Sequence, residues 1–563
     1  MARLRSPIKV SLGERAPKAP DSAMGELEGE RERFGLQRVI YSVTGQERVR
    51  VKPGRYRAAV SRGAEFEVET VDVEVPADGE ATLTATLTRS VDTTGYVAAD
   101  FHQHTVGSID SPRSLCGRVV EDIAEGLEWA STTDHDNVTD FMPCVRELSL
   151  ERWFNATQGN EISVVGTGHF NAYPMPVGGA DPFRAVGAQY WADLSAQALF
   201  DRIRAEPTDP ILHISHPRST GLKGYFTSIA LDPFSLTGRQ PLATGFEAIE
   251  VNTEVGDPAD YLASNDAAAR MAAMRDPSSV PTLRDWFSML NRGDHTCALG
   301  NSDTHGRNDG SGWPHNLVRV GEDRPDRVDI AAIRTAIRAQ RVVVASGLTV
   351  RVRVNGQERM GHTEVVTPTA GAVELDVEVQ APSWVDARTL VLFENGRPLA
   401  LTDAGGGVFD ARVATERTDP FTLALGMDSP GRAGAVRFRA RVRVRPTRDS
   451  HYVALARGGP LSPVGSGDAI SYTNPVYVDV DGGGVEADAL SGGWPRARMR
   501  VYGRGRRSWR TSVARPPPAL GPCSRASSRS SVSSASGGWG RSTRRRTDGP
   551  AAASPSRCCT PSS

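Results

Sequence analysis

The sequence of 563 residues has few cysteines and no long apolar segment. None of its six cysteines shows CxxC spacing, which argues against a disulfide framework in the body of the chain. No run of eighteen apolar residues exists, so a membrane-spanning helix is excluded. Because the usual fate of an unpaired cysteine is burial as a thiol, we expect buried thiols at Cys116, Cys144 and Cys297.

The N-terminus also lacks a secretory signal. Residues 1–30 are charged and polar, and no apolar stretch follows Met1. As the sequence stands, this predicts a cytoplasmic protein. The alternative is an exported or periplasmic protein whose true start codon lies elsewhere.

The formal net charge of -1 hides two regions of opposite charge. Residues 491–563 contain 15 Arg, no Lys and one acidic residue, Asp548, which leaves 51 basic and 66 acidic residues before them. The tail from about residue 485 has three interpretations: a disordered Arg/Ser/Pro segment, a nucleic-acid-binding segment, or an out-of-frame translation of GC-rich DNA. We favour the third, because residues with AT-rich codons are almost missing from it, and nucleic acid is therefore not an expected partner.

Hydrophobic patterning divides the rest of the chain into four parts. Residues 1–34 are polar and predicted to be disordered, whereas 35–92 alternate in short runs that indicate a small β-sandwich. Residues 93–347 alternate apolar strands with helical stretches, which predicts an α/β domain with a mainly parallel sheet, long enough to close into a barrel. Alternation returns over 348–484 and indicates a second β-sandwich. The predicted helices are Ser114–Glu125, Ser195–Ala205, Ala259–Arg275 and Val328–Gln340.

Histidines and carboxylates gather in the α/β region. Eight of the eleven histidines lie between His102 and His305. The pairs His102/His104 and Asp303/His305 follow short apolar runs, and residues two apart on a strand face the same way. Imidazole and carboxylate groups are ligands of Zn²⁺, Mn²⁺ and Fe²⁺, and many of them rarely gather without a cation. The pattern predicts a multi-metal hydrolase site at strand ends, where α/β barrels build their active sites.

Other polar residues in this region have different interpretations. His213 has the opposite strand parity to His216, so we expect it to pack in the core or to support a ligand. Thr304 stands where a nucleophile elbow needs glycine, which makes a Ser-His-Asp hydrolase a poor interpretation.

The ordered motifs resemble those of the PHP superfamily (polymerase and histidinol phosphatase) of metal-dependent phosphoesterases, and within it the carbaryl-hydrolase-like branch. The resemblance runs from about Gly95 to Gly306 and rests on DFHQHT, SIDS, TDHD, GNE, GHFNAYP, SHPR and SDTH in the family's order. It implies a distorted (βα)7 barrel, here between the two β-sandwich domains, with two or three divalent ions (Zn, Mn or Fe) at its strand ends.

The resemblance also implies roles for individual residues. Glu161 would bridge metals, and with Asp303 it would tune their charge and orient a metal-bridging hydroxide for attack on a phosphoryl centre. Arg218 would bind a substrate anion, the alternative being a surface salt bridge. Asp110 departs from the family because it follows His104 by six residues, where many members have five. The implied metal ligands are His102, His104, Asp110, His135, Glu161, His169, His216, Asp303 and His305.

Three functions remain open on this basis. The implied partner is a small-molecule phosphoester. The same cluster could polarise a carbonyl instead, which would make the protein a carbamate, ester or amide hydrolase. The third possibility is a non-catalytic binding protein with structural metals. The sequence predicts no particular oligomeric state.

Overall fold

The computed structural model describes residues 7–14, 39–177, 185–221, 223–262, 271–272, 274–307, 309–425 and 435–486. The chain divides into two compact units, Met1–Pro495 and Arg496–Ser563, and every described residue belongs to the first. Most of the predicted helix Ala259–Arg275 and nearly all of the predicted tail lie outside the described residues. No helix in the described ranges is long and apolar enough to cross a membrane.

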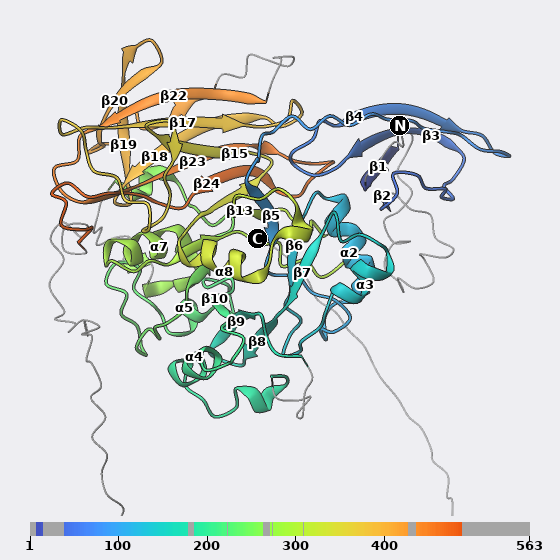
Figure 1. Cartoon of the computed structure of the whole chain (residues 1–563), viewed down its shortest axis with the longest axis horizontal. Helices are drawn as coiled ribbons and strands as arrows, with labels where there is room; N and C mark the ends of the chain where they lie inside the picture. Colours follow the sequence, from blue (N-terminus) through green and yellow to red (C-terminus); the bar gives the residue numbers. More distant parts are fainter. Residues whose placement is uncertain are drawn as a thin grey trace, which may run out of the picture. The chain divides into compact units, whose positions relative to one another are not determined.

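Four antiparallel strands near the N-terminus form one sheet, in the order β2-β1-β3-β4 (Figure 1). The prediction of disorder was wrong for residues 8–14, because this short run pairs with two distant strands: Val10 lies opposite both Ile40 and Val60. Of the described residues in 35–92, β2, β3 and β4 belong to this sheet, whereas residues 81–87, where apolar and polar residues also alternate, form no strand. The strands are β1 Ile8–Glu14, β2 Val39–Ser42, β3 Gly54–Ser61 and β4 Glu69–Val75.

A buried lysine ties this sheet to the rest of the unit. Lys9 on β1 is 7% exposed, and its Nζ donates to Glu125 Oε1 at 2.5 Å and to the Val464 carbonyl at 2.7 Å. A buried ammonium needs such partners, because its lost hydration is otherwise uncompensated. Lys9 therefore fixes β1 against the segment just after helix α2 (Leu115–Ala124).

The central part of the unit is mixed α/β. Strands β5, β6 and β7 run parallel, as do β10, β11 and β12, whereas β9 lies between β8 and β10 and is antiparallel to both. Hydrogen bonding divides these strands between two sheets, and no ladder among the described residues joins β7 to β8 to close a ring. The strands are β5 Tyr96–Asp100, β6 Trp129–Thr132, β7 Asn155–Gln158, β8 Asn160–Val164, β9 Gly168–Tyr173, β10 Ile211–Ile214, β11 Ala248–Glu250, β12 Cys297–Leu299, β13 His315–Arg319 and β14 Val342–Ser346.

Three of the four predicted helices are confirmed almost to the residue, because each begins at a recognisable cap. Ser114, Ser195 and Asp329 accept backbone N–H bonds at the starts of α2, α4 and α8. Their apolar residues recur with helical spacing and are buried against the sheets. The helices are α2 Leu115–Ala124, α3 Met142–Glu147, α4 Ala196–Arg204, α5 Tyr225–Ser228, α7 Thr282–Asn291 and α8 Ile330–Arg338, with 3-10 turns η2 Ala188–Tyr190, η3 Pro258–Tyr261, η4 Pro277–Ser279 and η5 Pro325–Arg327.

The central strands are covered on both faces. Every residue of β5, β6, β10 and β12 is buried, as expected for strands between helices. Phe101, Trp129 and Leu299 share one apolar cluster, and the ring of Phe101 stacks on Tyr173 with centroids 5.0 Å apart. This rigid apolar base positions the polar segments that follow the strands.

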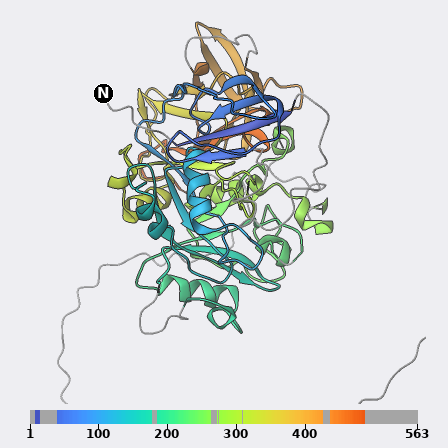
Figure 2. The ribbon, with the colours of Figure 1, turned by 90° about the vertical axis from the view of Figure 1, so that its right-hand side faces the viewer.

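The C-terminal strands continue the central sheet across the predicted boundary at 347/348. β14 pairs with β24, so both regions share one 16-stranded sheet. Figure 2 shows the C-terminal strands, in yellow and orange, in the upper part of the view, with cyan and green segments of the central region below them. Leu375 on β17, Leu392 on β18 and Ala454 on β23 meet in one core. The strands are β15 Thr349–Val354, β16 Gln357–Glu358, β17 Val373–Gln380, β18 Ala387–Glu394, β19 Arg397–Gly405, β20 Val408–Val413, β21 Leu423–Ala424, β22 Val436–Val444, β23 Ser450–Pro460, β24 Asp468–Thr473 and β25 Val476–Val478.

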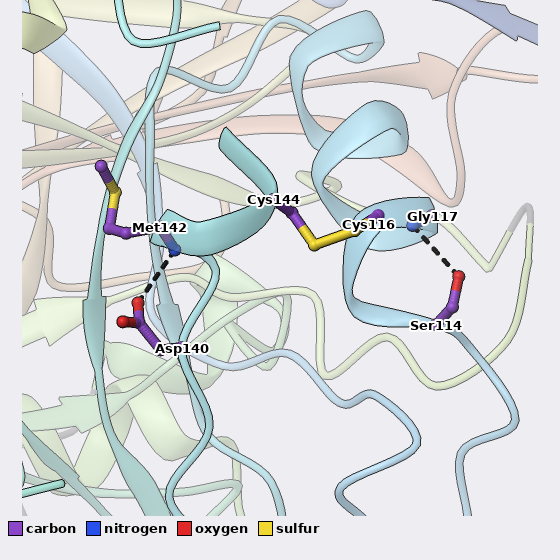
Figure 3. The surroundings of a disulfide bond; sticks show 6 residues. All are labelled: Ser114, Cys116, Gly117, Asp140, Met142 and Cys144. Carbon is purple, nitrogen blue, oxygen red and sulfur yellow. Dashed lines mark hydrogen bonds between the residues drawn. A yellow bond between two sulfur atoms is a disulfide. The ribbon is translucent and has the colours of Figure 1, made fainter. Parts of the chain in front are cut away.

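A disulfide joins Cys116 and Cys144, so the expectation of free thiols was wrong for these two (Figure 3). Cys116 lies in α2 and Cys144 in α3, which pack together with their Cα atoms 5.2 Å apart. Their separation of 28 residues resembles no short cysteine motif, so only the packing of the two helices reveals the pair. Cys297 is a buried free thiol, as predicted.

Candidate metal centre

The carboxylate of Glu161 lies among five imidazoles. Glu161 is on β8 and fully buried. Its Oε2 is 2.8 Å from Nδ1 of His135 and 3.4 Å from Nε2 of His104. Its Oε1 is close to three more rings: Nε2 of His102 at 3.1 Å, Nδ1 of His169 at 3.2 Å and Nε2 of His216 at 3.2 Å.

Asp303 is a second carboxylate surrounded by imidazoles, next to Glu161. Its Oδ1 lies 3.2 Å from Nε2 of His102 and 3.0 Å from Nε2 of His104. The same oxygen is 3.7 Å from Nδ1 of His305. Two histidines thus face both Glu161 and Asp303.

Asp110 completes the group. Its Oδ2 lies 3.2 Å from Nε2 of His135 and 3.3 Å from Nε2 of His305. The side chains of Asp110, Asp303 and His305 are 40%, 36% and 26% exposed, so the group opens to solvent on their side. The structure brings all nine predicted ligands together, and we call them the cage: His102, His104, Asp110, His135, Glu161, His169, His216, Asp303 and His305.

The cage forms where strands end side by side. β5 ends just before the His102–His104 segment and β12 just before Asp303–His305, and a bridge between Gln103 and Thr304 holds the two segments parallel. Glu161 and His169 are supplied differently, from within the antiparallel neighbours β8 and β9. Residues far apart in the chain meet because parallel strands present their carboxyl ends at one edge.

Two cage residues have a backbone conformation that side chains seldom adopt. The φ angles of His216 and Asp303 are 27° and 51°, in the left-handed region. Each is held by a hydrogen bond from its own N–H: His216 donates to Glu250 Oε2 at 2.7 Å, and Asp303 donates to the His102 carbonyl at 2.9 Å. Such strain persists only where the surroundings fix it, and it is typical of functional sites.

The charges of the cage reinforce one another. Burial alone would raise the pKa of Glu161, but the facing imidazoles, His102 first, hold it well below the usual value. Burial would likewise lower the pKa of His102, yet Asp303, Glu250 and Glu161 raise it well above the ordinary value. The Glu161 carboxylate is therefore ionised at the centre of the cage.

Divalent ions fit this donor set. Within the described part of the chain, Nε2 of His102 and Oε2 of Glu161 are buried and make no hydrogen bond of acceptable geometry. Buried polar atoms without partners are costly, and a cation coordinated by both would remove the cost. Overlapping groups of cage residues have their donor atoms close enough to share an ion: His104/Asp110/His135/His305, His102/His104/Asp303, His102/Glu161/His216 and His135/Glu161/His169.

Two partners behind the cage, Ser108 and Glu250, were not predicted. Nδ1 of His104 lies 2.8 Å from Ser108 Oγ, and Nδ1 of His102 lies 2.7 Å from Glu250 Oε1. Glu250 ends β11, an apolar run closed by a carboxylate, which is the pattern that marked other ligand positions. His213, predicted to pack or to support a ligand, is buried with its Nε2 3.2 Å from the same oxygen of Glu250.

Arg218 is not placed as predicted. It is 2% exposed, and its guanidinium donates to both oxygens of Asp285, at 2.8 and 2.5 Å. Further bonds run to the carbonyls of Pro277 and Leu231, each at 3.0 Å. The predicted contact with a substrate anion was therefore wrong, because the guanidinium is buried and bonded to protein groups, and the pair with Asp285 is a buried one rather than a surface salt bridge.

No protein-family model and no curated protein sequence matches the chain. Among solved structures, a "two-domain protein containing predicted PHP-like metal-dependent phosphoesterase" from Bacteroides vulgatus ATCC 8482 is 16% identical with a TM-score of 0.33, over 71% of this chain and 100% of that one. A "putative metal-dependent phosphoesterase" from Bifidobacterium adolescentis ATCC 15703 is 15% identical with a TM-score of 0.21, over 42% and 95%. Scores this low do not establish a common fold, so the function must be argued from the cage itself.

Proposed function

We propose that the protein is a metal-dependent hydrolase, a phosphoesterase of the PHP type with two or three divalent ions in the cage. The observation that carries the proposal is the convergence of six imidazoles and three carboxylates within hydrogen-bonding distance of one another. In this proposal the two central sheets together form the distorted (βα)7 barrel, and the strands on either side form β-sandwich domains.

The cage residues would have different roles in the reaction. Divalent ions bound by these residues would supply Lewis-acid chemistry, namely a water molecule of lowered pKa and polarised phosphoryl oxygens. Glu161, buried between five imidazoles, would hold the ions together with those histidines. Asp303, which is partly exposed and faces His102 and His104, would orient the attacking water at the open side.

A second candidate is hydrolysis of a carbamate, ester or amide, because the same ions would polarise a carbonyl oxygen. The position of Arg218 is compatible with this candidate, because the guanidinium that was expected to bind a phosphate is bonded to Asp285 instead. A non-catalytic protein with structural metals is the third. The open side of the cage favours the two catalytic alternatives, because structural sites are closed by protein ligands.

Metal content and substrate tests distinguish these functions. We expect elemental analysis of the purified protein to find two or three divalent ions per chain. Hydrolysis of p-nitrophenyl phosphate should exceed that of p-nitrophenyl acetate and of a naphthyl carbamate. His102→Ala and Asp303→Ala should each lower both ion content and turnover, whereas His362→Ala, outside the cage, should change neither.

Each alternative has its own result. Faster hydrolysis of the acetate or the carbamate would favour the second candidate. Full ion content without turnover on any of the three substrates would favour the third. Protein without bound ions, even after incubation with Zn²⁺ or Mn²⁺, would refute the proposal.

A further inference from the structure

Glu250 lies outside the cage and is buried directly behind it. It ends β11 with 1% of its surface exposed. Among the described residues its ion-pair partners are two imidazoles, His102 and His213, and no Lys or Arg side chain comes within ion-pair distance. A buried carboxylate without a cationic partner is uncommon, because its charge must be stabilised by hydrogen bonds instead.

The hydrogen bonds of Glu250 come from three neighbouring segments. Its Oε1 lies 2.7 Å from Nδ1 of His102 and 3.2 Å from Nε2 of His213, and it accepts from Nδ2 of Asn301 at 2.9 Å. Its Oε2 accepts from the backbone N–H of His216 at 2.7 Å. The two oxygens therefore face donors only, which stabilises the ionised form.

We propose that Glu250 is a positioning residue that fixes two cage ligands at once; this rests on the proposed function. As a carboxylate it accepts a hydrogen bond from Nδ1–H of His102, which leaves Nε2 of the neutral ring without a proton and directed into the cage. A histidine ligand must present such a nitrogen to a metal ion, and the partner on the other nitrogen decides which one it is. His102 faces both Glu161 and Asp303, so its orientation affects two ion positions.

The second fixed ligand is His216. Its backbone lies in the left-handed region, and the bond from its N–H to Glu250 holds it there while its Nε2 faces Glu161. Loss of Glu250 would release this turn as well as the ring of His102. One carboxylate thus couples the ends of β5 and β10.

Behind Glu250, His213 and Tyr173 extend the network. The Tyr173 hydroxyl lies 3.2 Å from Nδ1 of His213, whose Nε2 faces Glu250. If Nε2 of His213 carries the proton, Nδ1 accepts from Tyr173 and every contact joins a donor to an acceptor. All three side chains are buried, so this arrangement is protected from water.

The same three residues, His102, His213 and Glu250, have donor atoms close enough to share an ion themselves. Direct ligation by Glu250 is therefore the competing interpretation. It predicts that loss of Glu250 lowers the number of ions per chain, whereas a positioning role predicts weaker binding of the same number.

The test uses Glu250→Gln and Glu250→Ala in the full chain, with Glu247→Gln as the matched control. Both oxygens of Glu250 face hydrogen-bond donors. In Glu250→Gln one of them is replaced by NH2, which cannot accept, so the amide loses a hydrogen bond in either orientation. Glu247 precedes the same strand, but its Oε2 accepts from the Leu212 N–H, away from the cage. Calorimetric titration of the metal-free proteins with Zn²⁺ gives affinity and stoichiometry.

We expect both Glu250 variants to bind the wild-type number of ions about 10- to 100-fold more weakly, which is the usual effect of losing such a partner. The control should bind like the wild type. In ¹⁵N-histidine spectra of the Zn²⁺-bound proteins, the proton of His102 should lie on Nδ1 in the wild type and be distributed between Nδ1 and Nε2 in Glu250→Ala. A merely structural loss would not move this signal.

Two results would overturn the positioning role: unchanged Zn²⁺ affinity in both Glu250 variants, or one ion fewer per chain at saturation. An unchanged proton position on His102 in Glu250→Ala would also contradict it. Failure of the proposed function is distinct, because the wild type itself would then bind no ion or hydrolyse no ester.

Discussion

Replacing Arg218 tests whether this buried residue serves the fold or the substrate. Arg218→Ala would leave Asp285 fully buried without its bidentate partner, and would also free the carbonyls of Pro277 and Leu231. Removing one member of a buried ion pair costs about 3–5 kcal/mol, because the remaining charge keeps its desolvation cost. Burial already raises the pKa of Asp285 despite Arg218. In Arg218→Ala the carboxyl of Asp285 would take up a proton more readily. A neutral carboxyl costs less to bury than a charged one, which limits the loss of stability.

Urea unfolding followed by tryptophan fluorescence measures the effect. Arg292→Ala is the control, because its pair with Asp294 is 40% and 37% exposed and should be worth less than about 0.5 kcal/mol. The double variant Arg218→Met/Asp285→Leu should recover most of the lost stability, since apolar residues of similar size often replace a buried pair without cost. The folded fraction of Arg218→Ala should keep the wild-type KM. Unchanged stability with a tenfold higher KM would refute the structural role and restore the predicted contact with substrate.

Three further outcomes follow from the structure. Chelation of bound ions should lower the melting temperature, because ligands that bind only the folded state stabilise it by about 4 kcal/mol at a thousandfold excess over Kd; an unchanged melting temperature would argue against ions in the cage. Replacing both cysteines of the Cys116–Cys144 disulfide by serine should cost about 3–4 kcal/mol, as expected for a loop of this length, and reduction with dithiothreitol should reproduce the loss in a urea titration. Burial raises the pKa of Asp122 to about 8, so the folded chain holds a proton that the unfolded chain releases near pH 4, and stability falls as the pH rises between these values. Asp122→Asn should remove this fall, on the order of a few kcal/mol between pH 5 and 8, and a slope equal to that of the wild type would contradict the assignment.

The cage could be predicted because each contribution is local in sequence. His102/His104 and Asp303/His305 are separated by one residue, and each pair follows an apolar run that is a strand in the structure. The helices could be predicted for the same reason, since a cap such as Ser114 is read from its immediate neighbours. A local sequence preference predicts the structure correctly where no tertiary contact favours a different conformation at that position.

The features that the sequence did not reveal depend on distant partners. β1 is stabilised by pairing with β2 and β3, and its local signal is the alternation of Ile8, Val10 and Leu12 with polar residues, a run too short to predict a strand without its partners. Cys116 and Cys144 become a disulfide only because α2 packs on α3. Arg218 follows a ligand motif, yet its partner Asp285 comes from α7, 67 residues later.

The cage itself links metal binding to the stability of the fold. Its residues come from separate strands and loops, and two of them are held in left-handed backbone conformations. Within the described part of the chain, its buried atoms Nε2 of His102 and Oε2 of Glu161 lack hydrogen bonds. In the unfolded chain these groups would be hydrated and apart, so the free energy of ion binding becomes available only when the strands align. Rings that are held in place before an ion binds lose less conformational entropy when it does. Glu250 holds the ring of His102 from the buried side of the cage, where water cannot compete for its hydrogen bonds.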